Sequence, residues 1–155
     1  MTQEDKYLLL LKDLCTRIPY GVRCSFGVDD AVYEICGINP SCCGASAIQA
    51  THIKSSINGD FKLASCKPYL FPLSSMTEEQ KLYLEWHTKY RLDDGELVVK
   101  KDEDDEYLNT NIYDYLSLID WLNKNHFDYI GLIEKGLAVD ATNLGIYENK
   151  TITKD

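Results

Sequence analysis

The 155-residue sequence has no apolar run long enough to cross a bilayer, which takes about 20 residues. Its early apolar stretch, Tyr7–Leu11, is far too short for this. The start of the chain, Met1–Asp5, is acidic and lacks the positive charge that opens a secretory signal. We therefore expect a cytoplasmic protein with no membrane contact. In a reducing cytoplasm the six cysteines are expected to be free thiols: Cys15, Cys24, Cys36, Cys42, Cys43 and Cys66.

A basic stripe is also missing. The formal net charge is −9 and the pI is about 4.8. The one pair of adjacent lysines, Lys100-Lys101, runs directly into the acidic stretch Asp102–Glu106. Because binding to a nucleic-acid backbone needs Lys and Arg against phosphate, the composition argues against this class of function. Net negative charge is typical of a soluble protein, and it also suits a protein that docks on a basic partner.

The motifs of common metal and cofactor sites are absent. Cys36 and the adjacent pair Cys42-Cys43 do not have the paired spacing of a zinc site. Asp102, Asp104 and Glu106 alternate as in a calcium loop, but Tyr107 occupies the position of the obligatory glycine. No P-loop or dinucleotide fingerprint is present. The sequence therefore predicts no metal site and no cofactor. It also contains no local signature for a Cys–His nucleophile pair, so an enzyme of this kind is the weakest hypothesis.

Three helices are predicted. Thr2–Asp5 reads as a capping box that opens a helix over residues 3–17, which Pro19 and Gly21 end. Thr77–Gln80 is a second capping box, and it opens a helix over residues 78–91. The third helix covers residues 111–124. Apolar residues of the second helix are expected on one face and those of the third in a core-facing stripe: Leu82, Tyr83, Trp86 and Tyr90, and Ile112, Tyr115, Leu116, Ile119 and Leu122.

The stretch over residues 22–66 predicts a small antiparallel sheet. Val22, Cys24 and Phe26 alternate with polar residues, which indicates a half-buried strand, and Ala31–Ile38 is its expected partner. A weaker strand is expected within Ala47–Ser56, and Asn58-Gly59 is the strongest hairpin signal.

After this sheet, the two prolines of Lys67–Leu73 predict an extended connection. A solvated loop with a short edge strand at Leu97–Val99 is expected within residues 93–109. The predicted fold is thus α+β: one domain over residues 1–155, with an irregular C-terminal segment that packs back on the body. That segment is expected to cover Tyr113, Leu118 and Trp121 of the third helix in a monomer; otherwise this helix forms a homodimer or partner interface.

Two segments are candidate binding sites. Lys67 and Tyr69 precede the hydroxyls of Ser74, Ser75 and Thr77, which gather where a helix begins and where an anion is favoured. Helix capping by the same hydroxyls is the alternative, and it is the favoured explanation.

The second candidate segment is His126, Asp128 and Tyr129, polar and aromatic groups on a turn. Here the end of a helix followed by a packed aromatic residue is the alternative.

Several motifs together resemble a known set of proteins. They are Ile18-Pro19-Tyr20-Gly21-Val22, Lys67-Pro68-Tyr69-Leu70 with Ser74-Ser75-Met76-Thr77-Glu78-Glu79, and Trp121-Leu122-Asn123 followed by His126-Phe127-Asp128-Tyr129, Gly131-Leu132-Ile133 and Gly136-Leu137-Ala138. In this order they are similar to short, uncharacterised proteins carried by phages and phage-derived elements of gut bacteria. The resemblance implies a setting, the interior of an infected or lysogenic cell, and no mechanism.

We expect a non-enzymatic accessory protein that binds a host protein or a small anionic ligand. A sponge that sequesters a nucleotide-type defence signal is the first alternative, because phosphate suits a helix start and phenols stack on bases. A Cys–His hydrolase or transferase is the second.

Overall fold

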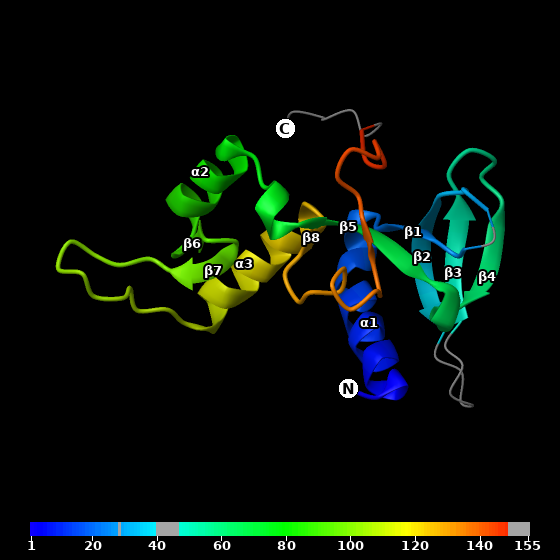
Figure 1. Ribbon diagram of the computed structural model, residues 1–155, viewed down its shortest axis with the longest axis horizontal. Coiled ribbons are helices and arrows are strands. Elements are labelled where there is room, and N and C mark those ends of the chain that lie inside the picture. Colours follow the sequence, from blue (N-terminus) through cyan, green and yellow to red (C-terminus); the bar gives the residue numbers. More distant parts are fainter. Residues whose placement is uncertain (28, 40–46, 149–155) are drawn as a thin grey trace. The chain divides into compact units, whose positions relative to one another are not determined.

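The structure is a computed structural model that describes residues 1–27, 29–39 and 47–148 (Figure 1). It confirms an α+β fold. The chain divides into two compact units: unit 1 comprises Met1–Leu70 and Ile130–Asp155, and unit 2 comprises Phe71–Tyr129. Each unit has a hydrophobic core of its own. A single domain over the whole chain stays a prediction, which cooperative unfolding can test.

The first helix of unit 1, α1 (Gln3–Arg17), has the predicted bounds. The Thr2 hydroxyl accepts the Asp5 backbone N–H at 3.1 Å, and the Asp5 carboxylate accepts the Thr2 N–H at 2.8 Å. The capping box therefore forms as expected. Leu10 and Leu14 are buried and join the core, so α1 packs on the sheet of unit 1 (Figure 1).

The sheet of unit 1 is larger than predicted, and it is mixed. Its antiparallel strands are β1 (Arg23–Ser25), β2 (Tyr33–Asn39), β3 (Ala47–His52), β4 (Asn58–Lys62) and β5 (Lys67–Pro72), in the order β4-β3-β2-β1-β5. The short strand β9 (Val139–Asp140) pairs with β5 in parallel. The correction concerns β5, which was expected to be only a connection. Its prolines lack N–H groups and so weaken the strand signal, but its carbonyls still pair: Leu70 O accepts the Ala141 N–H at 2.8 Å.

The predicted hairpin at Asn58-Gly59 is wrong, because both residues lie inside β4. The chain turns earlier, over residues 53–57, where Ser56 has a positive φ of 57°. Thr51 donates its hydroxyl to the Asn58 side chain at 2.7 Å, which fixes Asn58 opposite β3. Gly59 is needed for close packing rather than for a turn, since a Cβ there would lie 2.9 Å from the Phe61 ring.

The core of unit 1 lies between α1, one face of the sheet and the C-terminal segment. Phe26 and Phe61 stack with ring centroids 3.9 Å apart. Leu132 and Leu137 are buried in the same cluster. The C-terminal segment thus packs back as predicted, and it does so in the core of unit 1.

Unit 2 contains α2 (Glu78–His87), the hairpin of β6 (Tyr90–Asp93) and β7 (Glu96–Val99), α3 (Ile112–Lys124) and β8 (Phe127–Asp128). The short strand β8 pairs in parallel with the Phe71-Pro72 end of β5. The strand expected at Leu97–Val99 is β7, and the third helix has nearly the predicted bounds.

The second helix is shorter than predicted: it ends at His87 instead of Arg91. Thr88 takes an extended conformation, and its hydroxyl donates to the Leu84 carbonyl at 2.6 Å. The Tyr90 backbone N–H then donates to the Thr88 hydroxyl at 3.0 Å instead of to a helix carbonyl, so the helix does not continue past Thr88. Tyr90 and Arg91 then pair with Val99 and Val98 in the hairpin.

The buried faces of both helices also differ from the prediction. In α2 the buried residue is Leu84, whereas Leu82, Tyr83 and Trp86 are exposed. In α3 the buried apolar residues are Leu118 and Leu122. Three members of the predicted stripe, Ile112, Tyr115 and Leu116, are exposed because they belong to the first turns of α3, and the core of unit 2 lies farther along the helix.

Trp121 is covered within unit 2 itself. It stacks on Tyr83 at 5.6 Å and on Phe127 at 5.8 Å, measured between ring centroids. Of the other two α3 residues that the C-terminal segment was expected to cover, Leu118 is buried and Tyr113 is exposed. Leu132 and Leu137 of that segment pack in the core of unit 1 instead. Among the described residues, no helix is both long and apolar enough to cross a membrane.

Candidate functional site

The first predicted site is divided between the two units. Lys67 and Tyr69 lie on β5 in unit 1, where Lys67 is exposed and Tyr69 is half-buried. The backbone carbonyl of Tyr69 accepts the Tyr147 hydroxyl at 2.8 Å.

The three hydroxyls of this site lie near the start of unit 2. Thr77 accepts the Gln80 backbone N–H at 3.2 Å, and Ser75 donates to the Pro72 carbonyl at 2.7 Å. Ser74 is exposed beside them. The structure therefore brings Ser74, Ser75 and Thr77 together at the start of α2, with two of the hydroxyls engaged in local backbone contacts.

The second predicted site is largely buried. His126 adopts a positive φ of 59° directly after α3, and its carbonyl accepts the Phe71 N–H at 2.9 Å. Asp128 is also buried, and it is paired with Pro72 in the strand ladder. Tyr129 donates its hydroxyl to Asn123 at 3.0 Å. These contacts hold the turn after α3 in place.

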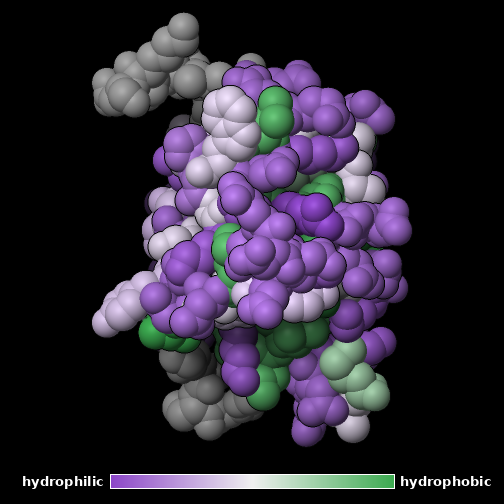
Figure 2. Space-filling model, turned by 90° about the vertical axis from the view of Figure 1, so that its left-hand side faces the viewer, coloured by the Kyte–Doolittle hydropathy of each residue, from purple (hydrophilic) through white to green (hydrophobic). Residues whose placement is uncertain are grey.

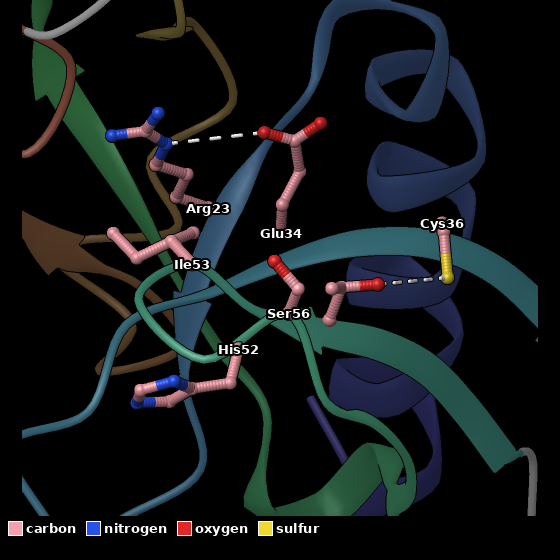
Figure 3. Close-up of a pocket in the computed structure, with 7 residues that line it drawn as sticks. Arg23, Glu34, Cys36, His52, Ile53 and Ser56 are labelled. Atoms are coloured by element: carbon pink, nitrogen blue, oxygen red, sulfur yellow. Dashed lines mark hydrogen bonds and ion pairs between the residues drawn. The ribbon is translucent and has the colours of Figure 1, made fainter.

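A pocket with a different set of polar groups lies on the outer face of the unit 1 sheet (Figure 3). It has a volume of about 340 Å³, within the range of small-molecule sites. The strands β1, β2 and β3 and the turn after β3 supply its lining residues: Arg23, Glu34, Cys36, Thr51, His52, Ile53 and Ser56. We call it the outer-face pocket. Ile35 and Ala50 face the core, so that their strand neighbours Glu34 and Thr51 point outward into the pocket.

Arg23 is the most distinctive group in this pocket, because it is a cation with only 9% of its surface exposed. Its guanidinium donates through Nη1 to the Ile146 carbonyl and lies 5.7 Å from the centroid of the Tyr147 ring. The Tyr147 hydroxyl accepts the Arg23 backbone N–H at 3.0 Å. Burial raises the pKa of the Tyr147 phenol, so the ring is neutral at physiological pH. These contacts fix the guanidinium in one orientation.

The Nε of Arg23 lacks a hydrogen-bond acceptor among the described residues. The nearest carboxylate oxygen, Oε2 of Glu34, is 4.0 Å away, beyond hydrogen-bond distance. Figure 3 shows Arg23 and Glu34 on the same side of the pocket, joined only by this long ion pair. A buried donor without an acceptor is costly.

Neutral polar groups line the rest of the pocket. The Thr51 hydroxyl donates to Asn58, and it also lies 3.9 Å from the Cys36 sulfur. Cys36 is exposed and donates its S–H to the Gln49 carbonyl at 3.3 Å. Ser56 projects from the turn after β3 (Figure 3). The pocket therefore combines one buried cation with hydroxyl, thiol and carboxylate groups.

Cys36 and His52 line the same pocket without forming a nucleophile pair. In Figure 3 they lie at opposite ends of the labelled set, and the imidazole points away from the sulfur. The Nδ1 atom of His52 is already engaged by Ser55, at 3.0 Å from its N–H and 2.8 Å from its hydroxyl. A Cys–His enzyme stays a hypothesis without geometric support at this pocket.

The described residues contain no group of three His, Cys, Asp or Glu side chains able to hold a metal ion. Cys42 and Cys43, which were considered as zinc ligands, lie outside the described residues.

No family model, curated protein or solved structure matches the chain. The inference of function therefore depends on the residues themselves. The strand alternation around Cys24 places Arg23 on the opposite face from the core, and this much was visible in the sequence. The proximity of Arg23 to Glu34, Thr51 and Ser56 depends on strand register and on the turn after β3, which was predicted at the wrong position.

Proposed function

We propose that the protein is a non-enzymatic accessory protein that binds a small anionic ligand in the outer-face pocket. The observation that carries this proposal is Arg23, a buried guanidinium whose Nε has no acceptor in the described residues. Arginine holds carboxylate and phosphate oxygens through charge-assisted hydrogen bonds, which are the strong ones. The resemblance of its motifs to those of phage-borne proteins supports an accessory role in an infected or lysogenic cell.

Glu34 limits which functional groups a ligand of this pocket can present. Its carboxylate accepts hydrogen bonds, and it lies on the same side of the pocket as Arg23. A fitting ligand therefore presents an oxyanion to Arg23 and an N–H or O–H donor to Glu34. Amino acids and nucleotides both have this pairing of groups, and the nucleotide sponge predicted from the sequence belongs to the second class.

Binding can be tested by thermal shift and by NMR titration of the full chain. The panel comprises amino acids, simple phosphates, cyclic di- and trinucleotides and adenosine-diphosphate-ribose. We expect at least one compound to raise the melting temperature. Arg23→Gln should then weaken binding by about 1.5–3 kcal/mol, or roughly 10- to 150-fold in Kd, the range for a hydrogen bond to a charged group.

Arg23 also anchors Ile146 and Tyr147, so its substitution can lower stability. Ser56→Gly is the second pocket variant: it removes a hydroxyl, and glycine accepts the positive φ at this position without strain. Lys67→Gln serves as the matched control, since it removes an exposed cation of the site predicted from the sequence. If Lys67→Gln abolishes binding while the two pocket variants bind normally, the ligand binds at the site predicted from the sequence and not in the outer-face pocket. A flat response to the whole panel would refute the proposal.

A further inference from the structure

The negative charge of the protein is concentrated in unit 2. Residues 71–129 contain 14 Asp and Glu against 6 Lys and Arg, a net charge of −8 out of the −9 of the whole chain. Figure 2 faces the end of Figure 1 that carries α2 and the β6–β7 hairpin, and hydrophilic residues cover most of it. The charge is therefore a property of this unit rather than an even coating of the chain.

The exposed aromatic side chains gather in the same unit. All the exposed Tyr and Trp side chains among the described residues lie there: Tyr83, Trp86, Tyr107, Tyr113 and Tyr115. Trp86 is 79% exposed and Tyr113 is 75% exposed, so neither contributes much to the core. Protein interfaces are enriched in Tyr and Trp, and these residues supply most hot spots.

Two contacts hold α2 beside α3. Tyr83 of α2 stacks on Trp121 of α3. Lys89, just after α2, forms a 3.0 Å ion pair with Asp114 in the first turn of α3. The end of α2 that carries Trp86 therefore lies close to the turn that carries Tyr113. We call these two helix ends, with their exposed rings and carboxylates, the acidic aromatic surface.

Unit 2 itself shows how such a surface holds a cation. Lys101 lies 5.2 Å from the centroid of the Tyr107 ring, and its ammonium group pairs with the Asp105 carboxylate at 3.0 Å. A ring face and a carboxylate together attract Lys or Arg more strongly than either does alone. A second copy of this chain fits poorly, because two units with a net charge of −8 repel each other.

We propose that the acidic aromatic surface docks a segment of a partner protein that is rich in arginine and lysine. Arginine side chains of that segment stack on Trp86 and Tyr113 and pair with the surrounding carboxylates, such as the exposed Glu85. This surface is independent of Arg23 and the outer-face pocket, so either proposal can fail without the other.

The test measures fluorescence anisotropy of a dye-labelled deca-arginine peptide titrated with the full chain at low ionic strength. Trp86→Ala and Tyr113→Ala should each weaken Kd at least about tenfold, as expected for interface hot spots. Leu144→Ala is the matched control, because it removes an exposed apolar side chain from unit 1 and should leave Kd unchanged. Circular dichroism checks that each variant is folded.

Three outcomes would overturn the proposal. No binding of deca-arginine by the wild-type chain excludes a basic partner at this surface. Equal binding by wild type and both aromatic variants means that net charge alone captures the peptide. A dimer in sedimentation velocity that Trp86→Ala dissociates would identify a second copy of the chain as the occupant.

Discussion

The buried ion pair of α1 allows the sharpest prediction about stability. Arg17 donates from Nε and Nη2 to the two carboxylate oxygens of Asp13, at 2.7 and 2.9 Å, and both side chains are 0% exposed. Asp13→Asn removes the charge while keeping the shape, and it leaves the Arg17 guanidinium buried without its counter-charge. Breaking a pair of this kind costs roughly 3–5 kcal/mol, a large part of the 5–15 kcal/mol that stabilises an ordinary domain.

Urea unfolding followed by circular dichroism measures this cost. With an m-value of about 2 kcal/mol/M, the midpoint should fall by roughly 1.5–2.5 M. Asp60→Asn is the control, since it makes the same charge change at an exposed position of β4 and should shift the midpoint little. Replacing both partners with apolar residues, Asp13→Leu with Arg17→Met, should restore most of the stability because no buried charge remains.

The reasoning fails if Asp13→Asn costs less than about 1 kcal/mol, or if the double replacement is as unstable as the single one. The same experiment tests the single-domain prediction. Both tryptophans, Trp86 and Trp121, lie in unit 2, whereas Asp13 lies in unit 1. If the chain unfolds as one domain, Asp13→Asn shifts the tryptophan fluorescence transition together with the circular dichroism transition.

Two further predictions concern titratable groups. The Asn111 backbone N–H and the Lys89 ammonium group hold the pKa of Asp114 below its usual value. Its stabilising effect is therefore present above the unfolded pKa, about 3.9, and is lost as pH falls through the lower folded pKa. Asp114→Asn should lower the melting temperature at pH 7, and the difference from wild type should close below about pH 4; a constant difference would contradict this. The hydrogen bond with Cys66, together with burial, raises the pKa of the Cys24 thiol. Because both thiols are buried, Cys24 and Cys66 should resist iodoacetamide at neutral pH until the chain unfolds. Mass spectrometry of the labelled peptides checks this, and rapid native labelling of either cysteine would refute it.

The sequence by itself determined the features that depend on neighbouring residues. The capping boxes at Thr2 and Thr77 form as predicted, because each joins residues three positions apart and depends on no distant partner. The alternation of Val22, Cys24 and Phe26 likewise fixed which side of β1 is buried. Fold class followed from these local patterns.

Only the tertiary structure decided which segments pair and which helix faces are buried. Asn58-Gly59 has strong turn propensity, yet its pairing with Thr51 and Ala50 holds both residues in a strand. In α3, apolar residues surround most of the helix, so the buried face depends on where Phe127 and Tyr83 lie.

The outer-face pocket also depends on the tertiary structure. Arg23, Glu34 and Thr51 lie on three strands, and a change of register by one residue would send each of these side chains to the opposite face. Register depends on contacts between residues far apart in the chain, and the local sequence does not encode these. The sequence thus determined the helix caps and the buried side of β1, while the tertiary structure decided where the charged and aromatic groups meet.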